Sequence, residues 1–283
     1  MSNAKEAGGK TVLITGASSG FGESLANSLK EKNYRVIGTS RQASAQGDIS
    51  SSGLTMAQLD VDDEASVNAL RDRLLSQGII PDIVVLNAGI WGCASIEETT
   101  MSMARAQFET NFFGVHRIVR ALMPPMRERK SGHFIFIGSL GAQIAVPFQG
   151  FYSASKAAIA SYADTLAMEA EGFGIDVSLV EPGNYNTGIG VVDLADKEQP
   201  SVYEPQYSRA LKIMVGQEQD GPKADKLTEF IVDIISGKRK KFRNVSGTFM
   251  ENLLLFLSRI LPDRKIQGML MQTFKMPERD KST

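Results

Sequence analysis

A short apolar segment runs directly into a cluster of glycines near the start of the chain. Residues 11–15 read Thr-Val-Leu-Ile-Thr, a β-branched run typical of a buried strand, and Phe21, Leu25 and Leu29 then recur at helical spacing. Gly16, Gly20 and Gly22 lie at the junction, where glycine allows the backbone to turn sharply. A strand, a glycine turn and a helix in this order predict the start of a βαβ unit.

The alternation of strand and helix patterns continues along the chain. We expect further strands at residues 34–38, 55–59, 82–86, 133–137, 175–180 and 242–245. We expect helices from about 62 or 63 to 74, at 101–123 before the weakening pair Pro124-Pro125, at 151–173 and around 230–235. Right-handed crossovers then place helices on both faces of one sheet. The predicted fold is an α/β, Rossmann-type doubly wound parallel sheet of about seven strands in a single domain.

The ends of the chain differ from this regular middle. Residues 1–9 are polar and predicted to be disordered, and Ser2-Asn3-Ala4 resembles a cloning remnant, so the single domain is expected to span 10–283. Residues 188–221 show no clean periodicity, which is more typical of a substrate lid than of a connector. Residues 248–283 are predicted to be a helical tail, with an apolar helix at 253–261 that Pro262 stops.

Composition excludes several classes of function. Thirty-one Lys and Arg against 32 Asp and Glu leave a formal charge of −1, which gives no long-range attraction to nucleic acid or to an anionic membrane. The single cysteine, Cys93, excludes an internal disulfide, and with only His116 and His133 we expect no metal site. The sequence shows no signal-peptide pattern, and its longest apolar run is far shorter than a membrane span. We therefore expect a cytoplasmic protein that acts on a small ligand.

The glycine turn favours a dinucleotide site over a plain glycine-rich turn because it opens a helix after the first strand. Free N–H groups at a helix N-terminus attract a pyrophosphate, and glycines let the backbone approach it. The spacing departs from G-x-G-x-x-G, since three residues separate the first two glycines. The residues expected to contact the cofactor here are Gly16, Ser18, Ser19, Gly20, Phe21 and Gly22.

The end of the second strand indicates which dinucleotide is bound. A carboxylate there would bind a ribose 2′-hydroxyl, whereas an arginine accommodates a 2′-phosphate. This chain has Ser40 and Arg41 and no acid before Asp48, so NADP(H) is preferred over NAD(H). A solvated arginine at a strand end is the alternative interpretation.

Tyr152 and Lys156 stand four residues apart at the start of a predicted helix, and therefore on one face. A nearby ammonium favours phenolate, so we expect it to lower the pKa of Tyr152 and make the phenol a usable general acid and base. Such a pair also arises by chance in roughly one chain in three of this composition.

The ordered set of motifs resembles the short-chain dehydrogenase/reductase family, closely over residues 10–187 and loosely beyond. The motifs are Thr15-Gly16-x3-Gly20-x-Gly22, Asn87-Ala88-Gly89, Asn111-Phe112-Phe113-Gly114, Ser139, Tyr152-x3-Lys156 and Pro182-Gly183. The tail resembles hydroxysteroid-dehydrogenase-like members. The resemblance implies an NADP(H)-dependent alcohol dehydrogenase or ketoreductase that forms a homodimer or homotetramer through the helices at 101–129 and 151–173.

The resemblance also implies a role for each matching residue. Tyr152 would exchange the proton with the substrate oxygen, Lys156 would lower the pKa of Tyr152 and hold the nicotinamide ribose, and Ser139 would bind the substrate oxygen. Asn111 would hold a water that links Lys156 to solvent. Further cofactor contacts would come from Asp60, Val61, Asn87, Ala88, Gly89, Pro182, Gly183 and Thr187.

Apolar residues beside these motifs suggest a pocket for a lipophilic carbonyl or alcohol. Trp91, Val146, Phe148 and Tyr185 are the candidates, although ordinary packing explains each one equally well. The basic cluster at residues 238–241 precedes the apolar 253–261 helix, so peripheral membrane contact is a minor alternative to a solvated face. Two further functions stay open: a non-catalytic NADP(H)-binding regulator, and an epimerase or dehydratase of the same family.

Overall fold

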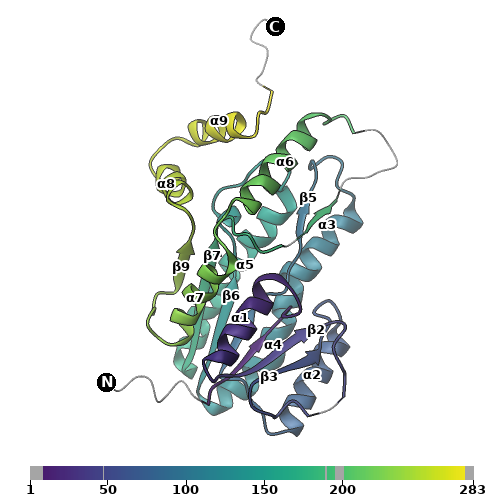
Figure 1. Ribbon diagram of the computed structural model, residues 1–283, viewed down its shortest axis with the longest axis vertical. Coiled ribbons are helices and arrows are strands. Elements are labelled where there is room, and N and C mark those ends of the chain that lie inside the picture. The colour runs from purple at the N-terminus through teal and green to yellow at the C-terminus, as the bar shows by residue number, and fades with distance from the viewer. Residues whose placement is uncertain (1–8, 47, 189, 195–200, 278–283) are drawn as a thin grey trace, which may run out of the picture.

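A computed structural model describes residues 9–46, 48–188, 190–194 and 201–277 of the chain (Figure 1). Most of the segment 1–9, for which we expected disorder, lies outside these ranges, as do parts of the expected lid and tail. The first half contains β1 (Thr11–Ile14), α1 (Gly20–Glu31), β2 (Arg35–Ser40), β3 (Leu54–Gln58), α2 (Glu64–Ser76), β4 (Ile83–Leu86), β5 (Trp91–Cys93), α3 (Met101–Phe108), η1 (Glu109–Phe113) and α4 (Gly114–Arg129). The second half contains β6 (Gly132–Ile137), η2 (Leu140–Ala142), α5 (Gly150–Ala170), η3 (Glu171–Phe173), β7 (Ile175–Pro182), β8 (Val191–Asp193), α6 (Gln206–Gln219), α7 (Ala224–Ile235), β9 (Arg243–Ser246), α8 (Phe249–Ser258) and α9 (Asp263–Thr273).

Seven parallel strands form the central sheet, in the order β3-β2-β1-β4-β6-β7-β9. The predicted Rossmann-type α/β class is therefore confirmed. The strand order reverses between β1 and β4, because the chain first builds outward through β2 and β3 and then crosses to β4. In doubly wound sheets, ligands bind beyond the carboxyl ends of the strands at such a reversal.

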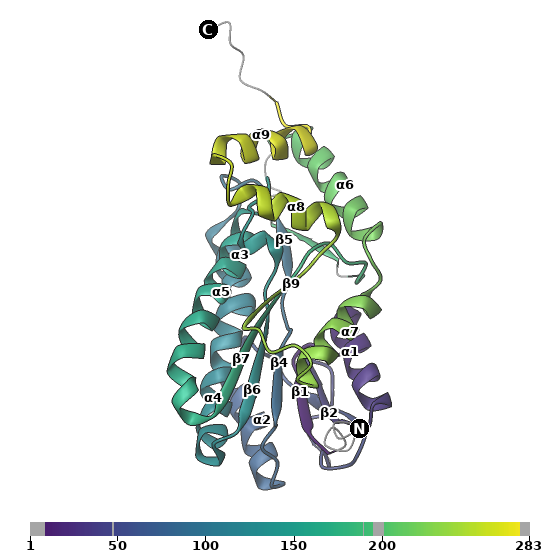
Figure 2. The ribbon, with the colours of Figure 1, turned by 90° about the vertical axis from the view of Figure 1, so that its left-hand side faces the viewer.

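Helices cover both faces of this sheet (Figure 2). On one face Val67, Val119 and Ile159, from α2, α4 and α5, share a buried cluster with Leu13 and Phe134 of the sheet. On the other face, residues of α1 and α7 pack against the alternate sheet residues in a second buried cluster. Strands covered on both sides are continuously apolar, which is why the apolar runs of the sequence located them well.

The helix expected at 101–123 continues to Arg129 but is interrupted by η1, one π-helical turn. Pro124 and Pro125 lie inside α4, so they do not weaken the helix to the extent that we expected. Buried Leu122 and Met126 anchor this last part of the helix, and such packing outweighs the lost backbone hydrogen bonds.

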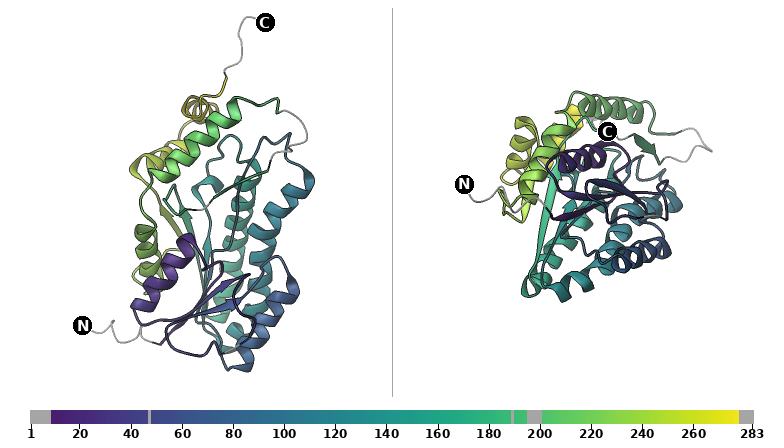
Figure 3. Two further views of the ribbon diagram at one scale, coloured as in Figure 1. Left: turned by 45° about the vertical axis from the view of Figure 1, so that its right-hand side comes forward. Right: turned by 60° about the horizontal axis from the view of Figure 1, so that its bottom comes forward.

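The region expected to be an irregular lid contains the short strand β8 and the four-turn helix α6. The expected apolar helix is α8, which ends at Ser258, before Pro262, but it is not the last helix, because Pro262 is the N-cap of α9. Figure 3 shows α6, α8 and α9 gathered at one end of the molecule, beyond the sheet. Across the described part of the chain, no helix combines the length and apolar character needed to cross a bilayer.

Candidate active site

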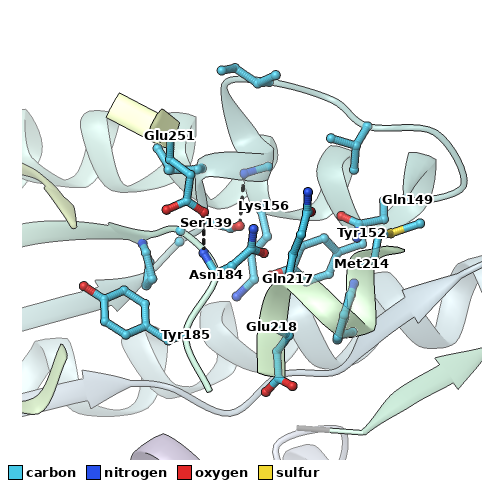
Figure 4. Close-up of a pocket in the computed structure, with 18 of the residues that line it drawn as sticks. Ser139, Gln149, Tyr152, Lys156, Asn184, Tyr185, Met214, Gln217, Glu218 and Glu251 are labelled. Atoms are coloured by element: carbon cyan, nitrogen blue, oxygen red, sulfur yellow. Dashed lines mark hydrogen bonds between the residues drawn. The ribbon is translucent and has the colours of Figure 1, made fainter. Parts of the chain in front are cut away.

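A cavity of about 310 Å³ opens where the carboxyl ends of β4, β6 and β7 face α6, α8 and α9. Nine of the predicted catalytic and cofactor-contact residues line it: Phe21, Asn87, Gly89, Ser139, Tyr152, Lys156, Pro182, Gly183 and Thr187. The helices α6, α8 and α9 form what we call the roof of the cavity. Figure 4 shows Ser139, Tyr152 and Lys156 in this cavity, opposite side chains of the roof. Sequence motifs that extend from Phe21 to Thr187 therefore converge on one space.

Tyr152 and Lys156 lie on the first two turns of α5, side by side as their spacing predicted. The Lys156 Nζ lies 5.9 Å from the centre of the Tyr152 ring and donates a hydrogen bond of 2.8 Å to the Ile137 carbonyl. Burial lowers the pKa of Lys156 to about 8. Burial also raises the pKa of Tyr152, which is opposite to our expectation, because desolvation of the phenolate outweighs every favourable interaction in the chain alone.

Ser139 lies two residues after β6 and is the N-cap of η2, where its Oγ accepts a hydrogen bond of 3.0 Å from the Gly141 N–H. A hydrogen bond with the Ser139 hydroxyl lowers the pKa of Tyr152 and offsets part of the burial effect. The serine and tyrosine hydroxyls therefore face the same point of the cavity. This arrangement can bind a single oxygen atom of a ligand from two sides.

Asn111 lies in the π-helical turn η1 and is almost fully buried. Its Oδ1 accepts from the Ile90 N–H at 2.8 Å, and its Nδ2 donates to the Ile90 carbonyl and the Ser155 Oγ at 3.1 Å each. A Cβ on Gly89 would lie 3.2 Å from Asn111 Oδ1 and 3.7 Å from Lys156 Nζ. Asn111 thus joins the segment after β4 to α5 beside Lys156, and π turns frequently occur at functional sites.

The glycine turn is built as the sequence predicted. Gly16 and Gly20 have φ values of 67° and 58°, which only glycine adopts without strain. A Cβ on Gly22 would collide with the Gly16 carbonyl and the Asn87 amide. The Asn87 Nδ2 in turn donates to the carbonyls of Thr15 and Gly16, at 2.9 and 3.0 Å.

The N-terminus of α1 offers room for an anion. Ser19 is its N-cap, but the Ser19 side chain makes no capping hydrogen bond. A helix N-terminus with an uncommitted hydroxyl, beside a backbone turn without Cβ atoms, is the cradle that a pyrophosphate requires. The residues of this turn therefore fit a dinucleotide.

The end of β2 carries no carboxylate. Arg41 follows Ser40 in an exposed position, and its guanidinium has no hydrogen-bond or ion-pair partner among the residues that the structure describes. At the end of β3, the Asp60 Oδ1 accepts from the Asp62 N–H at 3.1 Å, and Val61 packs against Gly114. These residues lie beside the glycine turn but do not line the cavity, because β2 and β3 are further out in the sheet.

The segment after β7 is held by two carboxylates from the roof. The Glu251 Oε1 accepts from the Asn184 N–H at 2.7 Å. The Glu218 Oε1 accepts from the N–H groups of Thr187 and Gly188, at 2.9 and 3.1 Å, and from the Thr187 hydroxyl at 3.3 Å. Thr187 lines the cavity as expected, although its hydroxyl is directed to Glu218.

Three of the four expected pocket residues line the cavity: Trp91, Val146 and Tyr185. Phe148 does not, since its ring packs edge-on against Tyr203 and Tyr207 beneath α6. Cys93 is fully buried, and burial raises its pKa to about 12, so it is a packing residue rather than a nucleophile. Among the described residues there is no cluster of side chains able to hold a metal ion.

Sequence reasoning missed the roof of the cavity. Its lining residues are Met214, Gln217 and Glu218 of α6, Glu251 and Leu254 of α8, and Leu270, Thr273 and Phe274 at the end of the chain's described part. The capping box Thr248-x-x-Glu251 was a signal that could have located the start of α8. No local pattern marks Glu218 as a site residue.

Comparison with known proteins agrees with this geometry. Residues 10–198 match the sequence model of the short chain dehydrogenase family. A 3-ketodihydrosphingosine reductase of Bacteroides thetaiotaomicron is 35% identical over 260 residues, which cover 90% of this chain and 94% of the relative. Human retinol dehydrogenase 8 is 34% identical over 257 residues, which cover 83% of this chain and 80% of the relative. A short-chain dehydrogenase structure from Streptomyces avermitilis superposes with a TM-score of 0.76 at 30% identity, over 94% of this chain and 97% of that one.

Proposed function

Because this chain belongs to the short-chain dehydrogenase/reductase family of oxidoreductases, we propose that it interconverts a carbonyl and an alcohol with NADP(H), using Tyr152 as general acid and base. The single observation that carries this proposal is the convergence of Ser139, Tyr152 and Lys156 on one cavity beside the glycine turn. The hydroxysteroid-dehydrogenase-like subtype remains only one of several that this arrangement would suit.

The cofactor would be held by groups that the chain leaves available for it. The glycine turn and the N-terminus of α1 would bind the pyrophosphate, and Lys156 would bind the nicotinamide ribose. Arg41 and Ser40 support a 2′-phosphate, since an exposed guanidinium that has no partner among the described residues fits phosphate, and the end of β2 carries no carboxylate. The bound dinucleotide would supply the hydride for reduction and accept it for oxidation.

The proton step belongs to residues of this chain. In reduction, the Tyr152 Oη would donate its proton to the carbonyl oxygen while the Ser139 Oγ donates a hydrogen bond to the same atom. In oxidation, the Tyr152 phenolate would take the proton from the alcohol. The charged Lys156 Nζ stabilises that phenolate, which is the form that burial disfavours.

We assign Asn111 a positioning role rather than direct contact with the reacting atoms. Its side-chain amide is committed to Ile90 and Ser155, so it fixes α5 against the segment after β4. Any water that links Lys156 to solvent would then be held by the backbone of η1 rather than by the Asn111 amide.

The cavity lining supports a lipophilic substrate. Trp91, Ile144, Val146, Leu254, Leu270 and Phe274 give its wall an apolar character. The relatives named as a 3-ketodihydrosphingosine reductase and a retinol dehydrogenase support the same class of substrate.

A panel of long-chain and polycyclic ketones and alcohols tests this proposal, with NADPH or NADP⁺ and with the non-phosphorylated pair. We expect turnover of lipophilic members, and Tyr152→Phe should lower kcat by about 10²–10⁴-fold because it removes the proton donor. Dinucleotide binding by Tyr152→Phe, measured by fluorescence titration, is the control and should persist.

Two outcomes would contradict the proposal. Equal rates for Tyr152→Phe and the parent would exclude the proton-transfer role. Tight dinucleotide binding without turnover of any carbonyl or alcohol would instead favour a non-catalytic, redox-sensing protein.

A further inference from the structure

The outer side of α8 presents a stripe of large apolar side chains. Phe249, Leu253, Phe256 and Ile260 recur at spacings of four, three and four residues, which places them on one side of the helix and its last turn. Phe249, Phe256 and Ile260 are 79, 60 and 62% exposed. Single exposed apolar residues are ordinary, but a contiguous patch marks an interaction surface.

The opposite side of α8 is apolar as well. Leu254 lines the cavity, Leu255 is buried, and Leu257 packs in the cluster beneath the roof. A surface helix of a soluble domain normally has one apolar side and one polar side. Since α8 has two apolar sides and only one of them is covered, its outer side lacks the environment that its sequence suits.

The helix α9 contacts α8 at this end of the molecule (Figure 2). We call the exposed residues of the α8 stripe the roof face: Phe249, Phe256 and Ile260. The roof face lies close to the cavity, because the other side of α8 contributes cavity-lining side chains. A surface that docks here would therefore lie next to the ligand site.

The charge around the roof face is positive. Residues 249–277 contain four cations, Arg259, Arg264, Lys265 and Lys275, and two carboxylates. One carboxylate, Glu251, is turned inward to accept hydrogen bonds from Asn184 and Thr248. Residues 249–277 therefore have a net charge of +2, against −1 for the whole chain.

We propose that the roof face docks on the surface of an anionic lipid bilayer, with its aromatic and aliphatic side chains at the headgroup boundary. Exposed apolar side chains rimmed by Lys and Arg are the combination that binds an anionic bilayer without crossing it. A second copy of this chain is the less suitable occupant. A symmetric dimer would bring two positive roof faces together, whereas lipid phosphates neutralise them.

Co-sedimentation of the full chain with vesicles tests the proposal. The probes are vesicles of phosphatidylcholine alone and vesicles that contain about one third phosphatidylglycerol. We expect binding to the anionic vesicles that weakens as salt is raised, and much weaker binding to the neutral ones. Absence of binding to both vesicles would overturn the proposal.

Matched variants separate the apolar and the charged contributions. Phe256→Ser with Ile260→Ser should lower partitioning roughly tenfold or more, because each side chain contributes apolar area. Leu75→Ser, an exposed residue at the end of α2, is the control and should leave partitioning unchanged. Unchanged binding by the double variant would contradict docking through the roof face.

Arg264→Gln with Lys265→Gln should weaken binding to anionic vesicles by roughly thirtyfold, since each cation near such a surface contributes about 1 kcal/mol. The exposed pair Lys30 and Lys32 at the end of α1, replaced in the same way, is the control. Thermal melting and dinucleotide titration establish that each variant is folded.

Sedimentation velocity tests the alternative that a second copy of this chain covers the roof face. The bilayer proposal is wrong if the parent chain does not bind vesicles and Phe256→Ser with Ile260→Ser converts an oligomer to monomers. The roof face is then an interface between copies of this chain. These readouts measure binding rather than turnover, so their outcome does not depend on the proposed reaction.

Discussion

The Glu218 carboxylate accepts hydrogen bonds from both the backbone N–H and the hydroxyl of Thr187, at 2.9 and 3.3 Å. Glu218 belongs to α6 of the roof, and Thr187 belongs to the segment after β7 that we expect to meet the cofactor. A negative charge therefore lies beside the space where an anionic dinucleotide would bind. The same carboxylate also fixes the segment that would receive that dinucleotide.

Glu218→Gln should separate these two effects, because it keeps an oxygen acceptor and removes the charge. We expect the dissociation constant for NADPH to fall by about three- to tenfold, since a like charge is removed at close range. Glu218→Ala should loosen the segment and raise that constant, and Glu229→Gln on the exposed side of α7 is the control. Fluorescence titration measures all three, and equal weakening by Gln and Ala would show that the charge itself is needed.

Arg41 should give the protein a preference for NADPH over NADH. Its guanidinium is exposed, lacks a partner among the described residues and follows the end of β2. Arg41→Gln should weaken NADPH binding by about tenfold or more, the value of one charged hydrogen bond to a phosphate. NADH binding should change by less than about twofold. Lys32→Gln removes another exposed cation and should alter neither constant, so an equal loss for both cofactors in Arg41→Gln would refute the assignment.

The sheet could be predicted from the sequence because each central strand is an apolar run buried on both faces, as residues 83–86 and 134–136 illustrate. The π-helical turn at Asn111 could not, since the sequence there follows the same helical pattern as its neighbours. The turn forms because the Asn111 amide bonds to Ile90 and Ser155, and these tertiary partners are distant in sequence.

The site residues that lie opposite the roof could be predicted for a related reason. Ser139, Tyr152 and Lys156 belong to local motifs whose positions relative to strands fix them at one edge of the sheet. Apart from the capping box at the start of α8, the roof had no such signal, because Glu218 and Leu270 reach the cavity through helix packing that the fold decides. Phe148 was placed wrongly for the same reason: its neighbours Tyr203 and Tyr207 come from α6 and the segment just before it, which are distant in sequence.

Gly22→Ala should damage both stability and dinucleotide binding. The added Cβ would collide with the Gly16 carbonyl and with the Asn87 amide, which two hydrogen bonds to backbone carbonyls hold in place. Overpacking of this kind lowers the free energy of unfolding by about 1–3 kcal/mol, and the displaced turn would no longer fit a pyrophosphate.

The control is Gly216→Ala on α6. Its added Cβ meets no neighbour within 4 Å, so this variant should leave stability unchanged or raise it slightly. Urea unfolding and NADPH titration measure both, and normal binding by Gly22→Ala would contradict the role of the turn.

His133 should make the fold sensitive to acid. Burial lowers its pKa to about 4, and its Nε2 lies 2.9 Å from the Ser178 Oγ, whereas an unfolded chain protonates histidine near its usual pKa of about 6.5. Between these values the unfolded state binds more protons, so the free energy of unfolding should fall as the pH drops from about 6.5 to 4. Urea unfolding at several pH values should show a shallower fall for His133→Gln, while exposed His116→Gln keeps the parent slope. Identical slopes for His133→Gln and the parent would contradict this origin of acid sensitivity.

Lys156 should set the alkaline limit of carbonyl reduction. Burial lowers its pKa to about 8, and burial raises that of Tyr152, so the lysine loses its proton first as the pH rises. Since kcat/KM reports the pKa values of the free enzyme, kcat/KM for reduction should decline through about pH 8.

Ser139→Ala should lower the rate of reduction without moving this decline, because it leaves Lys156 in place. In Lys156→Arg the guanidinium stays charged at every accessible pH. This variant should reduce carbonyls more slowly than the parent, but its kcat/KM should show no decline near pH 8. A decline that persists in Lys156→Arg would assign the titration to another group, and a parent profile that stays flat to pH 10 would show that the charge on Lys156 is not needed for reduction.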